Sequence, residues 1–233
     1  MRPLAALTAP VTDVLNGLDR CLTRGVRSLA MVFVGMLAGW WVYVPVHELL
    51  HAAGCLAAGG KVSRLEIAPA YGGTLFAQLL PFVVAGSEYA GRLSGFDTHG
   101  SDWTYLATDL APFVLTLFPG VWLLRRAAGA RKALGFGAAL PFALAPFLSL
   151  TGDAYEIGAI AVTRLPPWSR WPLLLRGDDL VQRIVELARR SDLPAATWAG
   201  LALAALLGVV WAFLTWWAGD ALARLLGQAP VRR

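Results

Sequence analysis

A histidine, a glutamate and a second histidine form the pattern H-E-L-L-H at His47, Glu48 and His51, within an apolar stretch from residue 29 to residue 58. Residues four apart lie on one face of an α-helix, so both imidazoles can bind a single metal ion. The carboxylate beside them can accept a proton from water. This spacing is typical of hydrolytic zinc sites. We therefore predict that His47 and His51 bind Zn²⁺ and that Glu48 is the catalytic base.

The same three residues have a simpler interpretation, in which polar side chains merely line an interface between packed helices. Ionisable groups are costly in hydrocarbon, however, and those within membrane-spanning helices are usually functional. We therefore favour the metal site. Cys55 lies one turn after His51, and a small apolar packing residue is the better interpretation of it than a third ligand.

Composition indicates an integral membrane protein, because 57% of the 233 residues are hydrophobic and the mean hydropathy is +0.58. Four apolar runs are long enough to cross a hydrocarbon core of about 30 Å as helices. They cover residues 29–58, 105–124, 133–162 and 195–218. The predicted fold is all-α, with about four transmembrane helices, a re-entrant or β-hairpin segment and an interfacial helix.

The chain is predicted to form one membrane-embedded, metalloprotease-like domain, residues 1–233. Besides the motif helix at 29–58 and the three later spans, it contains a cytoplasmic-side lead at 1–28, a re-entrant segment at 62–86 and an interfacial segment at 163–194. The apolar run 72–86 is too short to cross the bilayer. Residues 178–190 begin with acids, end with arginines and carry an apolar stripe, which predicts a short interfacial helix.

The net charge of +5 comes from arginines near predicted membrane edges, which indicates lipid-facing or topological charges rather than a surface for nucleic acid. Arg125, Arg126, Arg131 and Lys132 form a cluster without a nearby acid in the sequence, and we place it in the cytoplasm. If residues 72–86 do not cross, both termini lie on that same side.

A catalytic zinc usually takes three protein ligands, so the two histidines need a partner. Asp153 is the strongest candidate, since it lies about 30 Å of helix into its span and His47 lies about 27 Å into a parallel one. Glu156, one turn later, is the next candidate or a partner of the ligands. His99 is a weaker candidate in a polar loop, and Asp109 lies near the start of its span.

Residues 46–67, V-H-E-L-L-H-A-A-G-C-L-A-A-G-G-K-V-S-R-L-E-I, resemble the site-2 protease family of intramembrane zinc metalloproteases. The resemblance covers about 22 residues closely and the order of the spans loosely. It implies that Gly60, Lys61 and Val62 form the exit from the motif helix, that residues 65–86 supply a membrane-associated β-hairpin, and that Asp153 is the third ligand. It also implies a zinc site toward the cytosolic side, whereas the arginine count places it toward the outside; the absolute orientation stays open.

The predicted function is hydrolysis of peptide bonds in membrane-spanning substrates, with a membrane protein or peptide and the lipid bilayer as partners and no nucleic acid. We expect a multi-pass protein of the bacterial cell (inner) membrane, and the oligomeric state is left open. Two alternatives remain. One is a non-proteolytic metal-binding scaffold or transport component. The other is a prenyl-peptide-type membrane metalloprotease in which Glu156 is the ligand.

Overall fold

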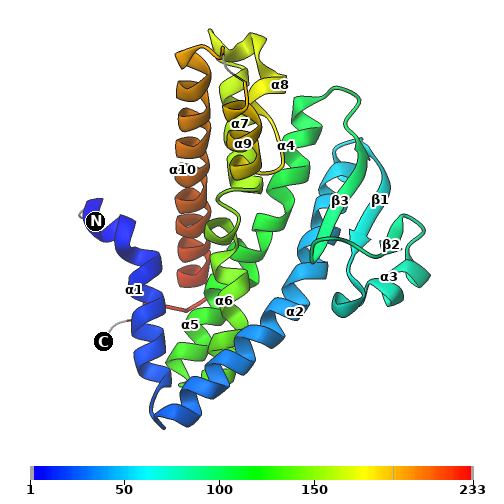
Figure 1. The fold of residues 1–233 in the computed structure, drawn as a ribbon. Helices are drawn as coiled ribbons and strands as arrows, with labels where there is room; N and C mark the ends of the chain where they lie inside the picture. Colours follow the sequence, from blue (N-terminus) through cyan, green and yellow to red (C-terminus); the bar gives the residue numbers. More distant parts are fainter. Residues whose placement is uncertain (1–2, 191, 232–233) are drawn as a thin grey trace.

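The computed structural model describes residues 3–190 and 192–231 as a helical bundle with a small sheet beside it (Figure 1). Within these residues, four helical segments are long and apolar enough to cross a membrane. They are Val26–Ala57, Asp102–Gly129, Ala133–Thr163 and Ala195–Leu225. The prediction of an all-α integral membrane fold with about four transmembrane helices is confirmed.

Helix α2 (Val26–Ala57) carries the histidine motif and runs parallel to α6 (Ala133–Leu148). The two backbones touch at small residues: a Cβ on Gly35 would lie 2.1 Å from the carbonyl oxygen of Leu134, and one on Gly39 would lie 2.3 Å from that of Ala138. Contacts therefore advance in the same direction along both helices. This is the parallel arrangement that the sequence predicts for the two ligand-bearing spans.

The predicted span 133–162 is not one continuous helix. Helix α6 ends at Leu148, and α7 (Asp153–Thr163) begins after four residues of turn. The turn has the sequence Ser-Leu-Thr-Gly, whose Ser, Thr and Gly are weak helix formers. As a result Asp153 lies in the first turn of a helix, where the partial positive charge of the helix end favours a carboxylate.

Helix α10 (Ala195–Leu225) runs antiparallel to α7 and packs tightly against it. A Cβ on Gly158 would lie 2.0 Å from the carbonyl oxygen of Ala204, and one on Gly208 would lie 2.5 Å from that of Ala154. Side chains larger than hydrogen at these positions would push the helices apart. The glycines therefore allow α7 to pack closely against α10, and this packing sets the position of Asp153.

The predicted span 105–124 is also interrupted. It consists of α4 (Asp102–Leu110), a 3₁₀ turn (η2, Ala111–Phe113), a π-helical turn (η3, Thr116–Gly120) and α5 (Val121–Gly129). Pro112 and Pro119 lie in the two turns, and proline lacks the amide hydrogen that a continuous helix requires. Helix α4 crosses α2 closely, since a Cβ on Gly54 would lie 2.4 Å from the carbonyl oxygen of Ala107.

The segment between α2 and α4 forms a three-stranded sheet rather than a hairpin within residues 65–86. The elements are β1 (Lys61–Ile67), η1 (Pro69–Tyr71), α3 (Gly73–Leu79), β2 (Val83–Ala85) and β3 (Gly91–Asp97). Strand β1 is central, antiparallel to β3 and parallel to β2. A parallel pair needs a crossover connection, and η1 with α3 supplies it. The predicted hairpin was therefore wrong in its second strand, which is β3.

The amino-terminal segment is an ordered helix, α1 (Pro3–Cys21), that packs against α5 and α6 (Figure 1). Its Asp13 accepts a 2.5 Å bond from Arg125 of α5, and Arg125 also pairs with Asp220 of α10. All three belong to one buried or half-buried cluster. The basic cluster has no acid near it in the sequence, but the fold brings two distant acids, Asp13 and Asp220, to Arg125.

The segment after α7 contains η4 (Trp168–Arg170), α8 (Pro172–Leu175) and α9 (Leu180–Ala188). Helix α9 corresponds to the interfacial helix predicted at 178–190. The side chain of Asp179 caps it by accepting a 2.9 Å bond from the backbone of Gln182, and Leu187 is buried against α7 and α10. In Figure 1, α8 lies beyond the last turn of α7. The start of α9 returns to the turn that precedes α7, where the backbone of Leu180 donates a 2.7 Å bond to the carbonyl of Thr151.

The topology has a direct test. Single cysteines at positions 61 and 101, placed in the Cys21→Ala, Cys55→Ala background, should be labelled from the same side of the membrane, because Thr104 Oγ1 donates a 3.0 Å bond to the carbonyl of Ala58 and joins the two segments. A cysteine at position 129 should be labelled from the opposite side. Labelling of positions 61 and 101 from opposite sides would overturn the parallel arrangement of α2 and α6.

Candidate metal centre

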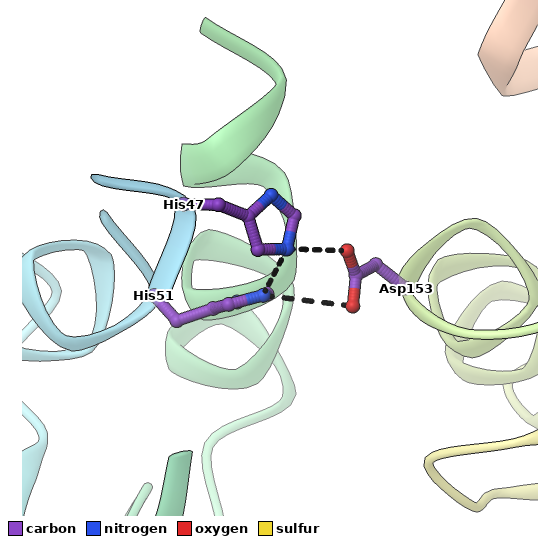
Figure 2. A group of neighbouring side chains, drawn as sticks. All are labelled: His47, His51 and Asp153. Atoms are coloured by element: carbon purple, nitrogen blue, oxygen red, sulfur yellow. Dashed lines mark hydrogen bonds and ion pairs between the residues drawn. The ribbon is translucent and has the colours of Figure 1, made fainter. Parts of the chain in front are cut away.

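Three side chains converge where α2 faces the first turn of α7. Figure 2 shows His47 and His51 projecting from one face of α2 toward Asp153. The two Nε2 atoms are 3.1 Å apart. Asp153 Oδ2 lies 3.2 Å from Nε2 of His47, and Asp153 Oδ1 lies 3.5 Å from Nε2 of His51. Within the described residues, this is the one group of three or more His, Cys, Asp or Glu side chains close enough to hold a metal ion.

The outer nitrogen of each imidazole is held by a neighbour. His51 Nδ1 lies 2.9 Å from the carbonyl oxygen of Thr108. A carbonyl only accepts hydrogen bonds, so Nδ1 carries a proton, and in the neutral imidazole Nε2 then has a lone pair that can bind a metal ion. His47 Nδ1 lies 2.8 Å from the hydroxyl oxygen of Tyr43, which can accept a hydrogen bond from Nδ1 in the same way. Such bonds to the second nitrogen orient metal-binding histidines.

The donor set fits a divalent cation. Two imidazole nitrogens and a carboxylate face one another, and Zn²⁺ binds such sets of histidine nitrogen and carboxylate oxygen. Oδ2 of Asp153 is buried without a hydrogen-bond partner, so one coordination position is available on it. Ligand atoms of tetrahedral zinc, at about 2.0–2.2 Å from the metal, lie about 3.3–3.5 Å from one another. The separations of 3.1, 3.2 and 3.5 Å are close to those values.

The other two candidate ligands are not part of this group. Glu156 lies one turn beyond Asp153 and accepts a hydrogen bond from the hydroxyl of Tyr105. His99 lies in an exposed loop after β3, with Nδ1 3.0 Å from Asp97. The structure thus brings together the three ligands that the sequence favoured and leaves both alternatives outside the group.

Glu48 lies beside the ligands and faces the sheet. A Cβ added to Gly91, the first residue of β3, would lie 2.5 Å from Cγ of Glu48 and 3.3 Å from its Oε1. The absence of a side chain at Gly91 therefore leaves room for the carboxylate. Glu48, His51 and Asp153 line the same cavity, so a carboxylate and two of the three candidate ligands border one space.

The cavity has a volume of about 570 Å³ and is walled by α2, β3, α4, α7 and α9. At its edge, Arg92 of β3 donates a 2.7 Å bond to Asp178, which precedes α9. This bond raises the pKa of the Arg92 guanidinium above its ordinary value. The ion pair joins the sheet to the segment that precedes α9.

Some residues of the cavity were not predicted. Asp109, which the sequence places near the start of its span, is 3% exposed and lines the cavity from α4. Asp178 and Asp179 line it from the segment before α9. For Asp109, the sequence signal was its position within a predicted span, since acidic residues in membrane-spanning helices are usually functional. For Asp178 and Asp179, no sequence signal connected the interfacial segment with the histidine motif.

Comparison of the chain with protein-family models, curated proteins and solved structures finds no match in any of the three. The resemblance of residues 46–67 to the site-2 protease family therefore stays a prediction.

Proposed function

We propose that the protein is an intramembrane zinc metalloprotease that cleaves peptide bonds of membrane-spanning substrates. One observation carries this proposal: two imidazoles four residues apart and a carboxylate from a parallel span converge beside Glu48, which is not in the ligand group. A site that only binds a metal needs ligands alone. A carboxylate bordering the same cavity favours hydrolysis, because hydrolysis needs a group that accepts a proton from water.

In this proposal His47, His51 and Asp153 hold the zinc ion. When bound, zinc supplies Lewis-acid activation of water and of the scissile carbonyl group. Glu48 accepts the proton of the attacking water and delivers it to the leaving amine. Tyr43 and the carbonyl of Thr108 keep both imidazoles in place.

Within the bundle, the cavity beside these residues gives water and an unwound segment of substrate a place to meet them. Its volume of about 570 Å³ lies within the range of about 300–1,000 Å³ usual for ligand sites. Its walls combine carboxylates with the apolar side chains of Leu93, Phe96 and Val181. Such a lining suits a peptide segment that has polar backbone groups and apolar side chains.

The two alternatives are less well supported. A scaffold or transport component would have no use for Glu48 as a base. A prenyl-peptide-type enzyme would use Glu156 as the ligand, but the carboxylate of Glu156 is bonded to Tyr105 and lies outside the ligand group. Metal analysis and a cleavage assay distinguish all three.

Metal removal tests the proposal. Full-length protein purified in detergent should contain about one zinc per chain and cleave a set of single-span membrane peptides, with new termini identified by mass spectrometry. A chelator should abolish cleavage, and added Zn²⁺ should restore it whereas Mg²⁺ should not, because imidazole ligands suit zinc and magnesium prefers oxygen ligands. Zinc-free protein that cleaves at the normal rate would refute the proposal.

A further inference from the structure

Two buried carboxylates of the cavity have no role in the proposed metal centre. Asp109 of α4 is 3% exposed and Glu156 of α7 is 7% exposed, and both line the cavity with Asp153. Oδ2 of Asp109 is buried without a hydrogen-bond partner. Acidic side chains in a membrane-spanning region are costly unless a partner compensates them. The cavity is therefore expected to receive such a partner.

Nearby cations do not fill this role. Across residues 3–190 and 192–231, the ion pairs include none to Asp109 or Glu156. Arg92 lines the cavity but is bonded to Asp178 on the more exposed side. Among the described residues, the one side chain that donates a hydrogen bond to Glu156 is the hydroxyl of Tyr105, which orients the carboxylate without neutralising it.

The missing partner is better explained as an organic cation than as a second metal ion. A zinc site takes three or four protein ligands, and in the part of the chain that the structure describes only His47, His51 and Asp153 form a group of three or more. An ammonium or guanidinium group needs only one or two carboxylates. Phe96 adds an aromatic wall to the cavity, and the centroid of its ring lies 5.6 Å from that of Tyr105. An aromatic wall can contact both the aliphatic stem and the charged end of a Lys or Arg side chain.

We infer that Asp109 and Glu156 form a subsite for the positively charged side chain of a lysine or arginine in the substrate, next to the metal centre. This inference rests on the proposed proteolytic function for its substrate, but the subsite itself can be tested without cleavage. It predicts that the enzyme selects basic residues near the scissile bond of an otherwise apolar segment.

Binding of a side-chain analogue tests the subsite directly. Zinc-loaded full-length protein in detergent should be stabilised against heat by n-butylguanidinium, an analogue of the arginine side chain, and not by uncharged n-butylurea, because binding to the folded state raises its stability. Asp109→Asn should remove this difference, and Glu156→Gln should weaken it. Asp192→Asn, the same change at an exposed position, should preserve it. Zinc content checks that each variant is folded.

Cleavage selectivity provides the second measurement. Single-span peptides should carry Lys, Arg, norleucine or Glu at each position around a cleavage site. Wild-type protein should cleave the Lys or Arg peptide at least about tenfold faster than the norleucine peptide at one position, which corresponds to about 1.4 kcal/mol. In Asp109→Asn this ratio should fall to about one, whatever the absolute rate.

The outcomes separate the two proposals. Binding of butylguanidinium that depends on Asp109, in a protein that cleaves no peptide, would support the subsite and count against proteolysis. Cleavage without preference for a basic residue, together with equal binding in wild type and Asp109→Asn, would overturn the subsite and leave the proteolytic proposal standing.

Discussion

Glu48→Gln is expected to reduce peptide hydrolysis by about 10²–10⁴-fold, the usual contribution of a general acid or base, while zinc content stays near that of the wild type. Glutamine has nearly the same shape, so the space opposite Gly91 stays filled. An amide cannot accept the proton of water as a carboxylate does. Because Glu48 is not in the ligand group, the variant should lose the base and no ligand. Initial rates and metal analysis on the same preparation measure both effects.

Glu88→Gln is the matched control, since Glu88 is an exposed residue of the loop between β2 and β3. It makes the same chemical change at a residue that does not line the cavity and should cleave like the wild type. A folded, zinc-containing Glu48→Gln variant that cleaves at a near-normal rate would eliminate Glu48 as the base, and with it the proteolytic mechanism proposed here.

The relative placement of the ligand helices was predictable because it depends on local patterns. Helical spacing sets His47 and His51 on one face of α2, and the lengths of the apolar runs set their depth. The same length argument put Asp153 at matching depth on a parallel span, and the contacts of Gly35 and Gly39 with α6 confirm that direction. Hydrophobic length and helical periodicity together were sufficient to bring these three side chains near one another.

The breaks within the spans were harder to predict. The apolar composition of residues 133–162 masks the turn at Ser149–Gly152, because hydropathy measures burial and not backbone continuity. The turn nonetheless matters for the site, since it makes Asp153 part of the first turn of α7. The pairing of Arg125 with Asp13 and Asp220 was hidden for another reason: its partners are 112 and 95 residues away, and sequence spacing does not reveal such contacts.

The strand pairing in the sheet could not be predicted from the sequence pattern. Strand β1 follows directly from the exit of α2, but its antiparallel partner is β3, not a strand within residues 65–86. Residues of α3 are apolar enough to resemble a strand or a re-entrant run, and pairing depends on contacts across the sheet. The position of Gly91 opposite Glu48 follows from that pairing, so this boundary of the cavity was not predictable from sequence.

Asp153→Ala is expected to lose zinc and activity together. Removing it leaves His47 and His51 as the remaining ligands of the group, and a catalytic zinc usually takes three protein ligands. The change removes a carboxylate whose oxygens lie 3.2 and 3.5 Å from the two Nε2 atoms. Zinc content should fall well below one per chain, and hydrolysis should fall to the background rate, both measured on detergent-purified protein.

Glu156→Ala is the matched comparison, because Glu156 lies one turn later on α7, lines the same cavity and is outside the ligand group. It should keep most of its zinc and lose less activity, within the range of about 10–100-fold seen when groups around metal ligands are removed. Zinc retained by Asp153→Ala and lost by Glu156→Ala would show that the third ligand is Glu156 and would favour the prenyl-peptide-type alternative. Zinc retained by both variants would exclude both carboxylates and make His99 the next ligand to test, with a movement of its loop required to bring it to the histidines of α2.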